Sequence, residues 1–224
     1  LELAIGLNPT SLIDLGGLDW NMHMTYYTNE SEVTKLTVDP YNYGGFATFL
    51  GTYRIEEGVS PTAIVGADYD ANGNHIELGN ENPDFRLSFR NSLSFGPLSL
   101  SFLIDHKEGG HAINLANLIY DLGATTADYE ENGSRTAVLG GGSTAPYVES
   151  TTYTALRDLS LTYSLPGGLT EGYGLSNVQL GLALRNWWMA SDYTGLSPEV
   201  SQFGNEACLL YTSDAADEGL GVDL

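Results

Sequence analysis

The sequence is poor in cysteine, in basic residues and in long apolar runs. Cys208 is the only cysteine, so an internal disulfide framework is excluded. Only 8 Lys and Arg stand against 29 Asp and Glu, which gives a formal net charge of -21 at pH 7. This balance excludes nucleic-acid binding, because a phosphate backbone must be neutralised by Lys and Arg. No apolar run approaches the ~18 residues of a transmembrane helix, which excludes a helical membrane protein but not a membrane β-barrel.

Motifs that would predict an enzyme are also missing. The sequence contains no GxSxG, no P-loop and no Cys/His pair. Its histidines lack the HxxxH or HxH spacing of a metal site, and they are His23, His75, His106 and His111. The adjacent acids Glu56-Glu57 and Glu130-Glu131 fit solvated turns better than the spaced carboxylates of a glycosidase. We therefore expect a protein that is not an enzyme.

The most informative pattern runs from Phe85 to Asp105. Apolar residues occupy alternate positions, Gly96-Pro97 interrupts them, and a second alternation follows in which Leu103 is out of phase. A period of two predicts strands with one apolar and one polar face, and the Gly-Pro break predicts a β-hairpin. Each run is about ten residues long, which suits a tilted membrane-spanning strand better than the ~5–6 residues of a typical soluble strand.

Similar amphipathic strands are predicted at residues 1–7, 18–26, 155–165 and 178–186. Short turns join the strands at one end, and two long polar stretches, 28–83 and 107–153, join them at the other. We expect these stretches to be irregular, apart from a short strand near Thr62–Val65 and a helix at Ile113–Leu122 with Leu115, Ile119 and Leu122 on one side. The predicted fold class is all-β. It is an antiparallel up-and-down meander that forms a partial, open segment of a large outer-membrane β-barrel with long loops on one side.

In such a barrel the short turns face the periplasm and the long loops face outward. The Phe and Leu face of the strands would then contact lipid, and the polar face would line the lumen. Charged residues of the polar face would dock a plug or guide substrate, or simply solvate the lumen as ion pairs, and they are Arg86, Arg90, Asp158 and Arg185. Asn91 is the exception, because it is a polar residue on the predicted lipid face. Burial of Asn91 in a protein core would argue against the membrane assignment.

One polar turn resembles the start of a calcium-binding loop. From Asp68 onward, oxygen-bearing side chains occupy alternate positions and Gly73 stands at the sixth position. The complete motif has Glu at the twelfth position, where this chain has Gly79, and Glu77 comes two residues early. A plain turn and a weak extracellular Ca²⁺ site both remain open. The ligands of the calcium site would be Asp68, Asp70, Asn72 and Asn74.

Aromatic residues gather at the far end of the last predicted strand, namely Trp187, Trp188 and Tyr193. Aromatic rings concentrate at both interfaces of a membrane barrel, so these residues are candidate membrane-interface aromatics at the outer rim. The alternative is that they pack in the core of a β-sandwich.

The end of the chain differs in origin from the rest. Residues 208–218 match the translation of a common transposase sequencing adapter, and residues 221–224 fit its continuation in the same frame. We interpret residues 208–224 as an adapter-derived tail that is not native and exclude it from the fold. The chain also has no initiator Met and no signal peptide, so residues 1–207 are expected to be a fragment of a longer protein.

Two blocks of residues 1–207 resemble a known family. The first block begins at Tyr147-Val148-Glu149 and continues through Leu156-Arg157-Asp158-Leu159-Ser160-Leu161. The second contains Arg185-Asn186, Asp192-Tyr193-Thr194-Gly195 and Pro198-Glu199. Both resemble the C-terminal region of SusC/RagA-type TonB-dependent outer-membrane transporters. The resemblance extends over residues 1–207, which are therefore identified as a C-terminal part of a TonB-dependent receptor β-barrel.

The resemblance implies a function and a set of partners. Such transporters import glycans (oligosaccharides) or peptides across the outer membrane of Gram-negative bacteria. They draw energy from TonB through an N-terminal part that this chain lacks, and they work with a SusD-like surface lipoprotein. Outer-membrane lipid would surround the strands. The alternatives are a soluble or cell-surface all-β carbohydrate-binding module, which would bury its apolar strand faces in a core, and a passive porin, which would lack a plug.

Overall fold

The computed structural model describes residues 1–131, 133–140, 142–170, 174–175 and 178–199. The chain divides into two compact units. The strand unit comprises Leu1–Asn29, Phe85–Glu108 and Tyr153–Ser191. The loop unit comprises Glu30–Asp84, Gly109–Thr152 and, in its described part, residues 192–199. The proposed adapter-derived tail, residues 208–224, lies outside the described residues, and its assignment stays a prediction.

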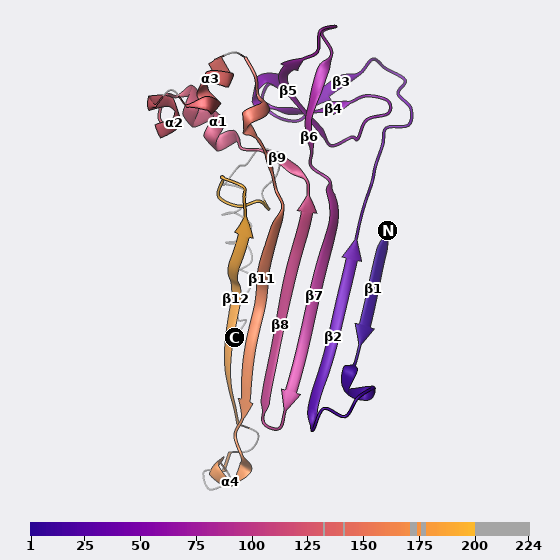
Figure 1. The fold of residues 1–224 in the computed structure, drawn as a ribbon, viewed down its shortest axis with the longest axis vertical. Coiled ribbons are helices and arrows are strands. Elements are labelled where there is room, and N and C mark those ends of the chain that lie inside the picture. The colour runs from indigo at the N-terminus through magenta and orange to yellow at the C-terminus, as the bar shows by residue number, and fades with distance from the viewer. Residues whose placement is uncertain (132, 141, 171–173, 176–177, 200–224) are drawn as a thin grey trace, which may run out of the picture. The chain divides into compact units, whose positions relative to one another are not determined.

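The strand unit is built on a six-stranded antiparallel sheet with the order β1-β2-β7-β8-β11-β12 (Figure 1). The strands are β1 Glu2–Leu7, β2 Leu18–Tyr27, β7 Pro83–Phe95, β8 Leu98–Gly109, β11 Tyr153–Ser164 and β12 Gln179–Ser191. All except β1 contain 10 to 13 residues. A tilted strand of this length can cross the hydrocarbon core of a bilayer. The predicted meander of long antiparallel strands is confirmed.

The predicted central hairpin is present as β7 and β8. Gly96 has a φ of +56°, a left-handed conformation that glycine adopts at little steric cost. Ser94 Oγ and Ser99 Oγ lie 3.1 Å apart on the two sides of the Gly96-Pro97 turn. The short connection therefore forces β7 and β8 into adjacent, antiparallel positions.

A β-bulge interrupts the pairing of β11 with β8. Leu156 lies opposite Ile104 and Asp158 lies opposite Leu103, so Arg157 is an extra residue on β11. A bulge of this kind changes which residues of a strand share a face. Leu156 therefore lies on the same face as Ile104, and Leu159 and Leu161 continue this apolar face beyond the bulge. Leu103, the out-of-phase residue of the hairpin, lies beside this irregularity.

Strand β12 is irregular at the same level. Asn186 and Trp187 together lie opposite the single residue Arg157. Asn186 has a φ of +47°, a left-handed conformation that asparagine tolerates better than most residues. The alternating pattern predicted a strand ending at residue 186, whereas β12 continues to Ser191. The prediction stopped early because the bulge breaks the period of two.

The first half of the loop unit is not irregular, as the sequence had predicted, but forms a four-stranded antiparallel sheet, β3-β4-β5-β6. The strands are β3 Tyr41–Tyr43, β4 Thr52–Ile55, β5 Ala63–Tyr69 and β6 His75–Asn80. The short strand predicted near Thr62–Val65 corresponds to the start of β5. Residues 63–66 of β5 are all buried, so they show no alternation between polar and apolar residues. Fully buried strands escape a search for periodicity for this reason.

The second half of the loop unit contributes to the same core. Ile64 of β5, Ile113 and Leu115 are buried together, with Leu50, Tyr53 and Val148 packed against them. Ile113 belongs to β9, His111–Ile113, which pairs with β10, Val148–Ser150. Two segments far apart in the sequence therefore share one hydrophobic core.

Short helices complete the structure. The α-helices are α1 Leu115–Leu122, α2 Ala127–Glu130, α3 Ser134–Gly140 and, in the strand unit, α4 Gly167–Thr170. The 3-10 helices are η1 Pro9–Ser11, η2 Thr48–Leu50 and η3 Ala145–Tyr147. None of the helices in the described part of the chain is long and apolar enough to span a membrane.

Helix α1 confirms the predicted helix but corrects its buried face. The side chain of Asn114 accepts a hydrogen bond from the Asn117 N–H and caps the first turn. The buried residues are Leu115, Leu118 and Asp121, whereas Ile119 and Leu122 are 48% and 52% exposed. The predicted face was wrong because Asp121 is drawn inside by a buried ion pair, and a hydrophobic pattern gives no weight to such a pair.

Candidate functional site

The apolar side chains of the long strands share one face of the sheet. Leu161 lies opposite Leu182, and Leu159 lies opposite Leu184. Leu180 and Leu182 are 61% and 60% exposed. Exposed large apolar side chains along one face of long strands are what contact with lipid requires.

Asn91 lies on this apolar face, opposite Met22, and is only 2% exposed. The indole Nε1–H of Trp20 donates a hydrogen bond of 3.0 Å to Asn91 Oδ1. The described part of the strand unit contains a single sheet, so Asn91 does not lie between two sheets of that unit. The condition that would have argued against the membrane assignment is not met.

The opposite, polar face of the sheet is organised around Asp105. Its carboxylate accepts hydrogen bonds from Ser88 Oγ at 3.1 Å and from the Tyr153 hydroxyl at 3.0 Å. Arg157 Nη2 lies 3.2 Å from the same carboxylate, and the guanidinium lies 5.2 Å from the centre of the Tyr153 ring. The bulge at Arg157 supplies this ion pair, which the alternating pattern did not predict.

The four charged residues predicted on the polar face are found there. Arg86 and Arg90 flank Ser88 at alternate positions of β7. Asp158 lies directly opposite Arg185, where opposite charges are favourable. Plug docking, substrate guidance and simple lumen solvation all remain compatible with this arrangement.

The predicted aromatic cluster is divided between the two units. Trp187 and Trp188 belong to the strand unit and are 67% and 51% exposed. Trp188 lies opposite Leu156, on the apolar face. Tyr193 belongs to the loop unit and is only 8% exposed, so it is not an exposed ring like the two tryptophans. The role of all three as membrane-interface aromatics stays a prediction.

The two blocks that resemble the transporter family meet in the loop unit. Thr194 donates from its backbone N–H at 2.7 Å and from its hydroxyl at 2.8 Å to the Glu149 carboxylate. Asn114 Nδ2, on a buried side chain, donates to Glu149 Oε1 at 3.0 Å and lies 3.1 Å from Thr194 Oγ1. A Cβ on Gly195 would lie 2.4 Å from the Tyr193 ring, so only glycine fits there. The matching motif residue Thr194 is therefore joined to β10 and to the N-terminal cap of α1 within the loop unit.

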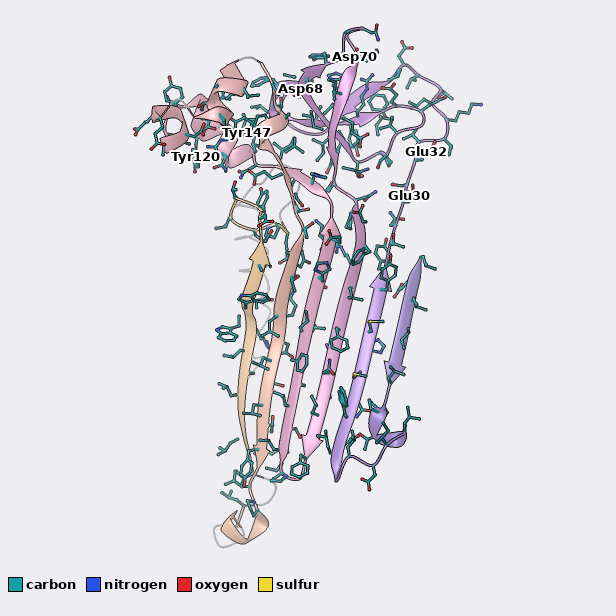
Figure 2. All side chains as sticks on the ribbon, viewed as in Figure 1. Glu30, Glu32, Asp68, Asp70, Tyr120 and Tyr147 are labelled. Atoms are coloured by element: carbon teal, nitrogen blue, oxygen red, sulfur yellow. The ribbon has the colours of Figure 1, made fainter. Side chains whose placement is uncertain are left out.

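An ion pair around the buried Asp121 carboxylate links helices α1 and α3 of the loop unit. Tyr147, labelled in Figure 2, contacts the same carboxylate. Arg135 Nε on α3 lies 2.5 Å from Asp121 Oδ2 on α1, and the Asp121 side chain has no exposed surface. Tyr147 and Thr126 donate their hydroxyl hydrogens to the same carboxylate. Burial alone would raise the pKa of Asp121, but these hydrogen bonds and the Arg135 charge lower it to about 2. No sequence motif indicated this network.

The predicted calcium ligands lie at the β5–β6 hairpin (Figure 2). The Asp70 carboxylate accepts hydrogen bonds from the backbone N–H groups of Asn72 and Asn74 at 2.8 and 2.9 Å. These and the Asn74 side chain lower the pKa of Asp70. Asp68 instead accepts from Ser143 Oγ at 2.5 Å and Thr144 N at 2.8 Å. In the described part of the chain, no three His, Cys, Asp or Glu side chains gather as a metal site, and the calcium site stays a prediction.

Comparisons with curated proteins show similarity to TonB-dependent receptors. No protein-family model matches the chain. TonB-dependent receptor P26 from Formosa agariphila is 28% identical over 90% of this chain. TonB-dependent receptor P3 from the same organism is 29% identical over 72% of this chain. The chain spans only 24% and 18% of the length of these two relatives.

Solved structures agree with that class at the level of the fold. The structure of the RagAB peptide transporter matches with a TM-score of 0.55 at 17% identity, over 88% of this chain and 26% of that chain. The RagAB peptide importer in its open-open state matches with a TM-score of 0.57 at 18% identity, over 91% of this chain and 27% of that chain. At such low identity the likeness shows the fold alone.

The strand unit is thus an open antiparallel meander with an exposed apolar face. The chain is a distant homologue of TonB-dependent receptors, which are outer-membrane transport proteins and not enzymes. Its strands match a fraction of the RagA barrel, the SusC/RagA type that the two motif blocks had indicated.

Proposed function

We propose that residues 1–207 form the C-terminal part of the barrel of an outer-membrane transporter that imports glycans or peptides. The observation that carries this proposal is the series of 10- to 13-residue strands with one apolar and one polar face. Similarity to TonB-dependent receptors over 90% of the chain supports it.

The partners follow from the same class. TonB would supply energy through an N-terminal part beyond this chain, and a SusD-like lipoprotein would cover the outward loops. The RagAB structures, described as a peptide transporter, support a peptide as one substrate class. The loop unit would then contact both the substrate and the lipoprotein, whereas the strand unit would contact lipid.

A soluble or cell-surface carbohydrate-binding module is the alternative. Such a module would bury its apolar strand faces, because exposed leucines in water cost free energy. Leu180 and Leu182 are more than half exposed in this chain, which favours the barrel over the module.

The test uses the complete protein encoded by the reading frame that contains this segment. We expect it to sediment with the outer membrane, to require detergent for extraction and to migrate differently on gels with and without boiling. We also expect a SusD-like lipoprotein to co-purify with it. A full-length protein that stays soluble and monomeric without detergent would refute the proposal. A barrel without a plug domain upstream would indicate a passive porin instead.

A further inference from the structure

We propose that the outer edge of β3 and the aromatic residues beside it bind an extended, cationic peptide. This inference rests on the proposed function, because it names the substrate class that the loop unit of the transporter would select. It is carried by three features of the loop unit, namely exposed aromatic rings, an open strand edge and a strong excess of negative charge.

The first feature is a series of exposed aromatic residues within residues 41–49, called here the aromatic strip, and they are Tyr41, Tyr43, Phe46 and Phe49. Their exposed fractions are 47%, 42%, 76% and 49%. Gly44 and Gly45, with φ of +70° and +73°, make the turn that separates the two tyrosines from the two phenylalanines. Glycine adopts such angles readily, so the turn holds large rings at the surface at low cost. Exposed aromatic residues are enriched at interaction surfaces.

The second feature is the open edge of β3. The sheet order is β3-β4-β5-β6, so in the described part of the chain β3 pairs only on the side of β4. An unpaired strand edge can accept an extended peptide as an additional strand, through main-chain hydrogen bonds. Alternate side chains of the added peptide would then lie beside Tyr41 and Tyr43, which share one face of β3.

The third feature is charge. In residues 30–84, 109–152 and 192–199 there are 17 Asp and Glu, and the basic residues are only Lys35, Arg54 and Arg135. Arg54 pairs with Glu56 at 3.1 Å, and Arg135 pairs with Asp121 at 2.5 Å. Two of the three cations are therefore already neutralised, and the field of this unit attracts positive ligands.

Acidic residues also lie close to the aromatic strip. Asp39 is two residues before Tyr41, whereas Glu56, which follows Ile55 opposite Tyr41, already pairs with Arg54. The Tyr53 hydroxyl donates a hydrogen bond to Glu81. The pKa of Tyr43 is raised mainly by its own burial and, to a smaller extent, by the negative charge of Glu81. Lysine or arginine side chains of a peptide would find both carboxylates and ring faces here. An anionic glycan would be repelled.

The experiment measures peptide binding to the complete transporter in detergent. The probe is a fluorescent ten-residue peptide of alternating valine and lysine, followed by fluorescence anisotropy. Its controls are the valine–glutamate peptide, the valine–lysine peptide N-methylated at alternate residues, and a neutral oligosaccharide. We expect only the unmodified cationic peptide to bind, with an affinity that falls as salt rises. N-methylation should abolish binding, because it removes the main-chain donors of the added strand.

Variants then locate the site. The double variant Tyr41→Ser/Tyr43→Ser should weaken binding by about tenfold, since each exposed cation–π contact contributes about 0.5–1 kcal/mol. The matched control is Tyr129→Ser, which removes a tyrosine of α2 that is 49% exposed. Equal binding of the two charged peptides, binding of the oligosaccharide alone, or an equal loss in both variants would each overturn the inference. A barrel that shifts on boiling but binds no peptide would overturn it while leaving the transporter proposal intact.

Discussion

In the strand unit, large apolar side chains such as Leu180 and Leu182 are exposed on one face of a single sheet, whereas in the loop unit Ile64, Ile113 and Leu115 are fully or nearly fully buried. Charge is divided in the same way. The strand unit contains 7 acidic and 5 basic residues, but the described loop unit contains 17 and 3. The two units of one chain therefore differ in how they place their apolar and charged side chains. The strand unit exposes apolar side chains on one face, whereas the loop unit buries its apolar side chains and carries a large excess of negative charge.

The largest expected effect tests the interior of the loop unit. Asp121→Ala should destabilise this unit by about 3 kcal/mol, because it leaves the buried Tyr147 hydroxyl without its acceptor and the partly buried Arg135 charge without its partner. Hydrogen exchange of the complete receptor would show this as lost protection in residues 115–147. The matched control is Asp105→Ala in the strand unit, where the carboxylate is 22% exposed and the effect should be smaller. Equal effects would contradict the contrast between the two units.

The next effect tests the lipid face. Leu182→Arg should destabilise the receptor in liposomes by ~2–4 kcal/mol if this residue lies near the middle of the bilayer. Ala183→Arg places the same charge on the polar face, opposite Ser160, and should have little effect. The measurement is denaturant unfolding of both variants. If Ala183→Arg were the more damaging of the two, the assignment of faces would be reversed.

Acid should loosen the loop unit before the strand unit. The pKa of Asp121 is about 2 in the folded chain, whereas an unperturbed aspartate has a pKa of 3.8. The ionised carboxylate therefore stabilises the fold above about pH 4. Its contribution, about 2 kcal/mol, should be lost as the pH falls from about 4 to 2. Hydrogen exchange at a series of pH values would follow it. Asp121→Asn should remove this pH dependence, and persistence of the dependence in that variant would assign it to another group.

A smaller effect tests how the apolar face tolerates a polar residue. Trp20→Phe removes the donor to Asn91 Oδ1 and leaves the buried amide without it, which should cost about 1–2 kcal/mol. Asn91→Leu removes the polar group altogether and should be neutral or stabilising. In the Asn91→Leu background the Trp20→Phe change should lose most of its effect. A double-mutant cycle by denaturant unfolding measures this, and strict additivity would show that the two side chains do not interact.

The smallest expected effect concerns calcium. If Asp68, Asp70, Asn72 and Asn74 bind Ca²⁺, the dissociation constant should lie near 10⁻⁴–10⁻³ M, as in weak extracellular sites. Isothermal titration of the complete receptor with Ca²⁺ would detect it, and Asp70→Ala should abolish the heat. No heat with the unaltered protein would leave the hairpin as a plain turn held by the Asp70 hydrogen bonds.

Much of the strand unit could be predicted from the sequence because its strands face two different environments. Alternation along Phe85–Asp105 encodes one apolar and one polar strand face, and the Gly96-Pro97 break encodes the hairpin. The helix at α1 was predicted from its apolar residues, although its buried face was not. The family resemblance rested on residues 147–161 and 185–199, whose partners in space the sequence did not reveal.

The tertiary structure alone decided the rest. The sheet β3–β6 was not predicted, because residues 63–66 are buried on both faces and show no period. The Asp121–Arg135 pair and the Glu149–Thr194 contact join residues 14 and 45 positions apart, and no local pattern records such distances. Amphipathic periodicity is a local pattern along a strand, so the sequence itself encoded the apolar and the polar face of the long strands. Long-range hydrogen bonds depend on which segments meet, so only the fold determined how the loop unit is held together.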